Sequence, residues 1–333
     1  MKIAIHYRKR LFTDRWIAFC EEQKILYKIV NCYDTDIISQ LEDCDVLMWH
    51  HTPKDPKDPL FAKQLLFSLE QSGKKVFPNF YTGWHFDDKV GQKYLLESIG
   101  APLVPTYVFY SKESALHWIK KTTFPKVFKL RGGSTSANVR LITNENIARQ
   151  IINKAFGKGF SQFNRIDYFK EQLRKYVEGK VDFIAVLKGI ARLIIGNKYA
   201  KLQRERGYVY FQDFISHNDH DIRVIVIGSR AFGIKRLNRK GDFRASGSGN
   251  IIYDRNVIPE ECVKIAFEVN RKLNAQCLGY DFVFDGNKPL LLEISYGFVA
   301  EAYDPCPGYW DESMTWHEGK FNPQEWMVEN LSK

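Results

Sequence analysis

Short apolar runs alternate with amphipathic stretches over the first 80 residues of the chain. Strands are predicted where apolar residues run together, and helices where they recur every three or four positions. Strands and helices in alternation predict a small, mostly parallel sheet covered on both faces. The predicted strands are Lys2–Tyr7, Ile25–Asn31, Asp45–His50 and Lys74–Phe77, and the predicted helices centre on Arg15–Gln23, Ile37–Glu42 and Leu60–Gln71.

A glycine-rich loop is the main feature of the next stretch. Asp87 is predicted to cap a helix that runs to about Ser98, with Gly100 just past its end. A strand over Lys126–Leu130 then leads into the loop, and another strand, Val139–Ile142, follows it. Backbone N–H groups of such a loop can fold over phosphates, although a plain hairpin turn fits the same residues. The loop residues are Gly132, Gly133, Ser134, Thr135 and Ser136.

Residues 144–206 are helix-rich and basic. The formal net charge of the chain is +10, and the stretch from Lys158 to Arg206 holds 12 Lys and Arg against 5 Asp and Glu. Such a field attracts anions, including ATP, an acidic substrate or nucleic acid. No nucleic-acid-binding motif accompanies these charges, so an amphipathic insertion with a solvated basic face is favoured.

A second group of cations follows the predicted strands Tyr208–Ile215 and Ile222–Ile227. Many cations close to a Gly-Ser-Gly loop suit a clamp for a phosphate or an acyl phosphate, and a solvated loop is the alternative. The group comprises Lys235, Arg236, Arg239, Lys240 and Arg244. A helix is predicted over Glu260–Leu273, and a tail rich in Pro, Trp and Tyr, predicted to be ordered, ends the chain.

The segment GYDFVFDGNKPLLLEISYG, residues 279–297, predicts a β-hairpin around Asp285–Lys288. With a three-residue loop, Asp285 pairs with Pro289, so that Asp281 lies opposite Glu293 with Ser295 on the same face. Two facing carboxylates among apolar residues repel each other and are costly to bury. A hard cation with oxygen ligands removes that cost, and Mg²⁺ commonly binds through one or two carboxylates and substrate phosphates. Two solvated acids are the alternative.

Composition narrows the class of protein. No apolar run is long enough to span a membrane, and the N-terminus lacks the apolar region of a signal peptide. The six cysteines form no CxxC pair, so we expect reduced, mostly buried thiols in a cytoplasmic protein. The first strand carries no dinucleotide-binding glycine motif.

Five segments in order resemble the ATP-grasp superfamily, in particular its carboxylate–amine ligase branch. They are DDKVGQKYLLESIGAP, FPKVFKLRGGSTS, FQDFISHNDHDIRV, the basic GDFR segment and GYDFVFDGNKPLLLEIS. The resemblance implies a flavodoxin-like, parallel α/β domain at 1–85, followed by a two-lobed α+β ATP-grasp fold. Its small lobe would be 86–210, with the insertion at about 144–206. Its C-terminal lobe would be 211–333, with the hairpin and a tail that covers the substrate.

The resemblance also implies roles for residues and the cofactors ATP and Mg²⁺, with one or two ions and Mn²⁺ as an alternative. Nucleotide contacts would come from Lys89, Lys129, the loop Gly132–Ser136, Gln212, Asp213, Phe214, Ile215 and Asp221. Metal ligands would be Asp281, Glu293 and Ser295, and the catalytic cations Lys235, Arg236 and Arg244. Ser295 stands where the family usually has Asn, and Tyr296-Gly297-Phe298 replaces the usual turn of small residues.

The predicted function is therefore an ATP-dependent ligase that joins an amine to a carboxylate through an acyl phosphate. An acidic sugar or sugar nucleotide of a surface polysaccharide, a peptide and an amino acid all remain open as acceptors. A phosphotransferase and a non-catalytic nucleotide- or nucleic-acid-binding protein are the alternatives, and a homodimer or tetramer is compatible with the sequence. Substrate contacts are predicted at His50, His51, Tyr81, Trp84 and His85, and the alternative for His50 and His51 is a solvated aromatic corner.

Overall fold

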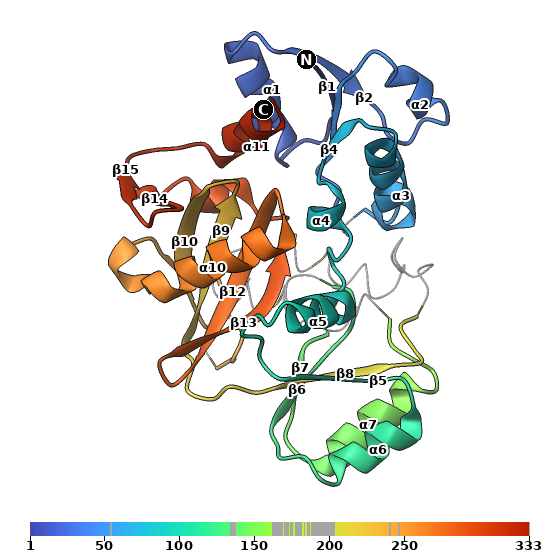
Figure 1. Ribbon diagram of the computed structural model, residues 1–333. Helices are drawn as coiled ribbons and strands as arrows, with labels where there is room; N and C mark the ends of the chain where they lie inside the picture. The colour runs from blue at the N-terminus through green and yellow to red at the C-terminus, as the bar shows by residue number, and fades with distance from the viewer. Residues whose placement is uncertain are drawn as a thin grey trace. The chain divides into compact units, whose positions relative to one another are not determined.

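The computed structural model describes residues 1–53, 55–133, 138–161, 204–239, 241–245 and 247–332, with isolated positions between 162 and 203. It divides into two compact units (Figure 1). The first holds Met1–Phe86, Leu95–Pro102 and His217–Lys333, and the second holds Asp87–Tyr94 and Leu103–Ser216. The predicted loop residues Ser134, Thr135 and Ser136, and most of the predicted basic insertion, lie outside the described residues.

The N-terminal part of the first unit is a four-stranded parallel sheet in the order β2-β1-β3-β4. This confirms the sheet that the alternating pattern predicts. The strands are β1 (Lys2–His6), β2 (Leu26–Val30), β3 (Val46–Met48) and β4 (Lys75–Phe77). The helices are α1 (Thr13–Glu22), α2 (Ile37–Gln40), α3 (Asp58–Gln71) and α4 (Phe80–Gly83).

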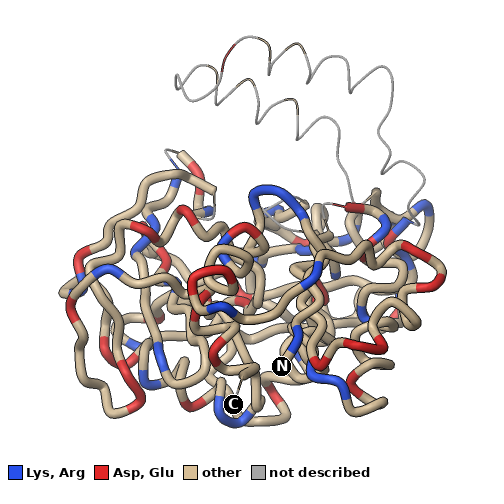
Figure 2. Tube along the Cα trace, turned by 90° about the horizontal axis from the view of Figure 1, so that it is seen from above, with Lys and Arg blue, Asp and Glu red and all other residues tan. Residues whose placement is uncertain are grey.

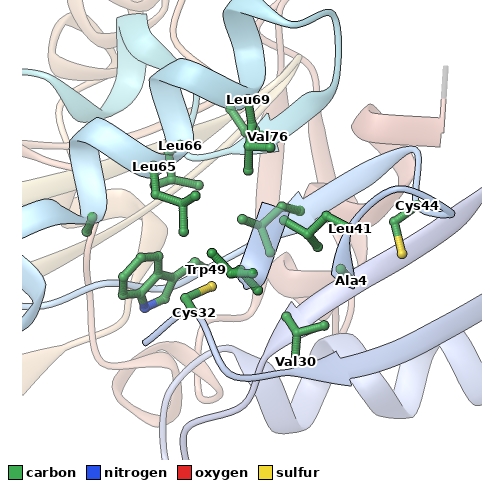
Figure 3. Packing of buried hydrophobic residues seen from close by; sticks show 13 residues of the cluster. Ala4, Val30, Cys32, Leu41, Cys44, Trp49, Leu65, Leu66, Leu69 and Val76 are labelled. Atoms are coloured by element: carbon green, nitrogen blue, oxygen red, sulfur yellow. The ribbon is translucent and has the colours of Figure 1, made fainter. Parts of the chain in front are cut away.

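Apolar side chains from the strands pack against α3 to form the core of this sheet (Figure 3). Leu65, Leu66 and Leu69 of α3 meet Val76 of β4 and Trp49, which follows β3. Burying such a side chain stabilises the fold by about 1.5–3 kcal/mol. All six cysteines are buried and none forms a disulfide, as the sequence predicts.

The rest of the first unit is a seven-stranded sheet whose pairings are all antiparallel. Its order is β13-β12-β9-β10-β14-β15, and β11 pairs with β10. Helix α10 packs on one face, where Asn270 accepts a hydrogen bond from the Tyr280 hydroxyl at 3.0 Å (Figure 1). The elements are β9 (His220–Ile227), β10 (Arg230–Leu237), β11 (Ile251–Ile252), η2 (Arg255–Val257), α10 (Glu260–Leu273), β12 (Cys277–Asp285), β13 (Lys288–Ser295), η3 (Ala300–Tyr303), β14 (Gly308–Asp311), β15 (Trp316–Glu318) and α11 (Pro323–Ser332).

The second unit is built on a four-stranded antiparallel sheet in the order β5-β8-β6-β7. Two helices, α6 and α7, pack on this sheet (Figure 1) through a core that includes Ile119, Ile152 and Phe211. Its elements are β5 (Thr106–Phe109), α6 (Lys112–Ile119), β6 (Lys126–Lys129), β7 (Arg140–Ile142), α7 (Glu145–Ala155) and β8 (Val209–Asp213). The residues of α5 (Lys89–Ser98) are divided between the two units.

The cap of α5 differs from the sequence-based prediction. Asp88, rather than Asp87, precedes the first helical residue, and its Oδ1 accepts a hydrogen bond from the backbone N–H of Gly91 at 2.8 Å. Asp87 has a positive φ of 55° and accepts a hydrogen bond from Gly133 N–H at 2.8 Å. Two consecutive acids satisfy the same capping pattern, and the tertiary contact with the glycine loop decides between them.

Candidate active site

The β12–β13 hairpin places Asp281 opposite Glu293, as predicted, but by a different route. Asp285 pairs with Lys288, so the turn has two residues and the predicted pairing of Asp285 with Pro289 is wrong. Gly286 has φ of 60°, which glycine adopts without strain. The register then shifts between Asp281 and Phe282, with Leu292 as the additional residue of a β-bulge. The bulge restores the facing pair that a three-residue loop would have given.

Charged side chains line one face of this sheet across four strands. Asp281 of β12 is paired with Glu293 of β13 on one side and with Arg223 of β9 on the other. Asp221 lies two residues from Arg223 on β9 and is paired with Arg236 of β10. Because alternate residues of a strand share a face, all five side chains point to the same side.

Salt bridges connect four of these groups. Arg236 donates to both carboxylate oxygens of Asp221, at 2.6 and 2.8 Å, and lies 3.0 Å from an oxygen of Asp281. Arg223 lies 3.2 Å from the other Asp281 oxygen. All four residues are at most 9% exposed. Charge-assisted hydrogen bonds of this kind are strong and fix geometry.

The pKa values in this cluster reflect burial opposed by neighbouring charge. Burial, with repulsion from Asp281, raises the pKa of Asp221 to about 6, although Arg236 and Arg223 oppose the shift. Burial disfavours the charge on Arg236, but the carboxylates of Asp281 and Asp221 outweigh it and raise its pKa well above the ordinary value. The pKa of Arg223 is raised as well, so both arginines stay charged.

This network corrects the electrostatic argument made from the sequence. From the sequence, a metal ion is needed to make the pair Asp281 and Glu293 tolerable, whereas in the structure two guanidinium groups already compensate Asp281. Arg223 is not among the residues predicted from the sequence. The sequence nevertheless contains a feature that points to Arg223, because an arginine between Ile222 and Val224 in a buried strand needs an acidic partner.

Glycine at position 279 makes room for Arg223. A Cβ atom on Gly279 would lie 3.0 Å from one terminal nitrogen of Arg223 and 3.1 Å from its Nε. A side chain would therefore displace the guanidinium. The Arg223 guanidinium also donates to the Gly297 carbonyl at 3.4 Å, which the Ser295 hydroxyl contacts at 3.1 Å.

The predicted metal ligands offer oxygen atoms only. Among the residues that the structure describes, no three His, Cys, Asp or Glu side chains are grouped to hold a metal ion. The predicted set is smaller, with two carboxylates and the Ser295 hydroxyl on neighbouring strands. Mg²⁺ needs few protein ligands where water and substrate phosphates complete its shell, so these donors fit that ion.

The other predicted catalytic cations lie on the opposite face of β10 or in the loop that follows it. Lys235 precedes Arg236 on β10 and therefore points to the opposite face of the sheet. Arg244 donates through Nε to Asp242, at 2.9 and 2.8 Å. Arg239 is buried, with 7% exposure, and Lys240 lies outside the described residues. The predicted clamp is thus divided between a strand and a loop.

The predicted substrate residues His50 and His51 meet the segment that follows the hairpin. Both are buried, so the alternative of solvated histidines is wrong. Tyr296 donates its hydroxyl to the His51 carbonyl at 2.6 Å, and a Cβ atom on Gly297 would lie 3.4 Å from His50 Nε2. The stretch Tyr296-Gly297-Phe298, which departs from the family pattern, therefore joins the ends of the N-terminal strands to the hairpin.

The other predicted substrate residues lie on α4 or just after it. Tyr81 is 48% exposed, and its carbonyl lies 3.2 Å from Nε2 of the buried His85. Trp84 stacks on Phe80 with ring centroids 6.4 Å apart, and its carbonyl accepts a hydrogen bond from Lys63 at 2.7 Å.

Two buried histidines should make stability depend on pH. Burial and the charge of Arg8 lower the pKa of His6 to about 4, and burial, Lys63 and His50 lower that of His51 well below 6.5. The unfolded chain therefore takes up protons first as the pH falls. The free energy of unfolding should decrease from pH 6.5 towards 4, by up to about 1.4 kcal/mol per pH unit for each histidine.

Denaturant unfolding at pH 7, 6 and 5 measures this slope. His6→Asn should reduce this slope by about the contribution of one protonation. Replacement of the exposed His117 by Gln should leave the slope unchanged. Equal slopes in His6→Asn and the parent protein would contradict the assignment.

In the second unit, the structure brings together two of the predicted nucleotide residues. Lys129 of β6 donates to the Gln212 side chain of β8 at 2.6 Å, and both residues are buried. Gln212 in turn donates to the Thr106 hydroxyl at 3.1 Å. The neighbouring Asp213 lies 2.5 Å from Lys126, and the half-buried Phe214 and Ile215 follow β8.

The glycine loop is anchored by two groups at the start of α5. Lys89 donates to the Gly133 carbonyl at 2.9 Å, and Asp87 accepts from Gly133 N–H. Gly133 has φ of 116°, a conformation that favours glycine. Gly132, which precedes it, is buried.

Lys129→Met should raise the ADP dissociation constant at least about tenfold, because a phosphate contact through a charged hydrogen bond is worth about 1.5–3 kcal/mol. Titration calorimetry with ADP measures the change. Lys121→Met, an exposed residue of the same unit, is the control and should bind ADP as the parent does. An unchanged constant in Lys129→Met would remove Lys129 from the nucleotide site.

Comparisons with known proteins concern the fold and the family that the chain resembles. The family model described as a RimK-like ATP-grasp domain matches residues 162–299. The α-aminoadipate–LysW ligase LysX of Saccharolobus solfataricus is 20% identical over 323 residues, which are 94% of each chain. A D-alanine–D-alanine ligase from Bacillus anthracis, solved with ATP, superposes with a TM-score of 0.59 at 12% identity and covers 100% of this chain and 97% of its own. A RimK-domain ATP-grasp protein from Sphaerobacter thermophilus gives 0.58 at 13% identity and covers 99% of both chains.

The fold is therefore the ATP-grasp fold, here a parallel N-terminal sheet combined with antiparallel sheets. The chain is similar to the carboxylate–amine ligase branch of the ATP-grasp superfamily, through the RimK-like domain match and the likeness to the LysX ligase. It is an ATP-dependent ligase. In the described parts of the chain, no helix is both long enough and apolar enough to cross a membrane.

Proposed function

We propose that this protein forms an amide bond between the carboxylate of one substrate and the amine of another, and releases ADP and phosphate. The observation that carries the proposal is the row of Glu293, Asp281, Arg223, Asp221 and Arg236 on one sheet face. It combines oxygen donors that suit a divalent ion with cations that suit a transferring phosphoryl group.

The proposed reaction has two steps. An oxygen of the acceptor carboxylate attacks the γ-phosphorus of ATP, ADP leaves, and an acyl phosphate forms. The amine nitrogen then attacks the acyl carbon, the C–O bond to phosphate breaks, and the nitrogen loses a proton. Phosphoryl transfer depends mainly on positioning and charge neutralisation rather than on covalent chemistry by the protein.

In this proposal each group of residues has a defined task. Mg²⁺, held by Asp281 and Glu293 with Ser295, would supply charge neutralisation at the phosphates. Arg223 and Arg236 would hold negative charge that develops on the transferring group. Asp221 keeps Arg236 in place, since both of its oxygens accept from that guanidinium. This makes Asp221 a positioning residue, which differs from the direct nucleotide contact that the resemblance implies.

Lys89, Lys129 and Gln212 are proposed to contact the nucleotide, and His50 and His51 the acceptor. An amino acid is favoured as one substrate, because the named relatives ligate α-aminoadipate and D-alanine. An acidic sugar of a surface polysaccharide stays as a second proposal for the acceptor, and a cytoplasmic location stays a prediction.

A panel of amines and carboxylic acids, scored for ADP release with ATP and Mg²⁺, tests the proposed function. Mass spectrometry of the product should show both substrates joined with loss of one water. A stable phosphorylated product would instead indicate a phosphotransferase. No acceptor-dependent ADP release with any pair would contradict the proposal.

A further inference from the structure

Basic residues of the second unit lie at the start of β7, in and just after the last turn of α7, and just before β8. They are Arg140, Lys154, Lys158, Arg204 and Arg206, here called the cationic collar. Arg204 donates to the carbonyls of Lys158 and Gly159, at 2.6 and 2.8 Å. Gly159 N–H donates to the Lys154 carbonyl at 2.7 Å, and a Cβ atom on Gly159 would lie 2.8 Å from the Arg206 Cβ. These contacts hold the collar together.

Like charges in the collar are close enough to affect one another. Partial burial and the charges of Arg140 and Arg204 lower the pKa of Lys154. Lys154 lies in the last turn of α7, where the helix dipole favours a cation. That effect is confined to the last turn of the helix, so it does not extend to the other four cations.

No residue that the structure describes forms an ion pair with any of the five collar cations. Elsewhere in the second unit, Arg131 pairs with Asp88, and Arg149 with Glu145. Lys and Arg occur among Asp and Glu along the described chain (Figure 2). Within the collar, the half-buried Glu205 lies between Arg204 and Arg206, and its carboxylate accepts a hydrogen bond from the Tyr208 hydroxyl at 3.0 Å. Four of the collar residues are exposed and Arg140 is half-buried. The collar is therefore a surface of positive potential that is accessible to an anion.

Among the residues that the structure describes, none of the aromatic rings beside the collar is exposed. Phe160 is 3% exposed and lies beneath the Lys154 ammonium, 4.6 Å from it. Phe156 packs against the core of the unit. Single-stranded nucleic acids are held by stacking of bases on exposed rings in addition to charge, and such rings are lacking among the described collar neighbours. Carboxylates on flexible side chains need only cations, and Arg binds them in a bidentate manner.

We propose that the cationic collar binds an acidic polypeptide segment, that is, a run of Asp or Glu side chains on a protein partner. Such a segment would be a binding partner in addition to the substrates of the proposed ligase. Its binding is measured without ATP and therefore does not depend on ligase activity. A ligase that takes a protein-borne substrate would gain affinity from this contact while the reacting group is held elsewhere.

Fluorescence anisotropy with labelled poly-L-glutamate at low salt tests this inference. Lys154→Gln/Arg206→Gln should raise the dissociation constant roughly fivefold or more and make its salt dependence less steep. Arg204 is not substituted, because its hydrogen bonds to the carbonyls of Lys158 and Gly159 hold the loop in place. Lys112→Gln/Lys121→Gln removes the same charge from exposed positions near α6 and should change the constant less than about twofold. ADP binding by each variant verifies that it is folded.

Two results would overturn the inference. One is poly-L-glutamate binding that is the same in the collar variant, the α6 control and the parent. The other is tighter binding of oligothymidylate of equal charge, with that affinity lost in the collar variant, which would assign the collar to nucleic acid. If poly-L-glutamate binding does not depend on the collar while acceptor-dependent ADP release is observed, the collar proposal is wrong and the ligase proposal is supported. If collar-dependent binding is observed without ADP release, the ligase proposal is wrong and the collar proposal is supported.

Discussion

Glu293→Gln is expected to lower the rate of acceptor-dependent ADP release at least about a hundredfold, since a neutral amide replaces a carboxylate that would hold the divalent ion. The substitution keeps the size and shape of the side chain. Glu293 is the better target of the predicted pair, because Asp281 also neutralises Arg223 and Arg236. Steady-state kinetics with the best pair from the substrate panel measures the effect.

A second readout separates loss of the metal from loss of the fold. In the parent protein, Mg²⁺ should tighten ADP binding, and in Glu293→Gln this dependence should largely disappear while the unfolding midpoint stays close to that of the parent. Asp285→Asn removes an exposed acid from the turn of the same hairpin and serves as the control. Near-normal turnover with normal Mg²⁺ dependence in Glu293→Gln would withdraw the metal assignment.

Arg236→Met is expected to lower the free energy of unfolding by about 3–5 kcal/mol, because it leaves two buried carboxylates without their shared partner. Asp221 would lose both hydrogen bonds, and Asp281 would retain only Arg223. Urea unfolding followed by tryptophan fluorescence measures the change. Because Arg236 is also proposed to act on the phosphoryl group, turnover should fall as well.

The neighbouring residue on the same strand provides the control for this prediction. Lys235→Met makes the same change at a half-buried position on the opposite face, and it should cost less than about 1 kcal/mol. Arg236→Lys should recover part of the stability, since the charge remains although the bidentate contact is lost. Equal destabilisation by Arg236→Met and Lys235→Met would show that the buried network contributes little.

The β12–β13 hairpin shows how much of a structure the local sequence pattern can predict. Alternation and turn chemistry predict two strands and the facing pair of Asp281 and Glu293, and the structure has both. The turn length and the bulge at Leu292 are not predicted, because Asp285-Gly286-Asn287-Lys288 is compatible with a loop of two or three residues. A bulge depends on how the strand packs against its neighbours, which the sequence of one hairpin does not contain.

The site shows the same division between local and distant information. His50 and His51 were predicted near the substrate from their place after a strand, and their burial against Tyr296 comes from a contact between residues about 245 positions apart. Arg223 escaped notice because nothing near it in the sequence identifies its acidic partner. The choice between Asp87 and Asp88 as helix cap likewise depends on Gly133, which lies far along the chain.

The sequence by itself determined the succession of strands and helices, the parallel N-terminal sheet and the class of chemistry. These depend on periodicity, turn residues and the order of motifs, all of which are local in the chain. Only the tertiary structure decided which charges meet. The compensation of Asp281 by Arg223 and Arg236, the division of the predicted cationic clamp and the cationic collar all depend on strand register and on contacts between distant segments. Electrostatic energy depends on distances of a few ångströms in space, and spacing along the chain does not set those distances.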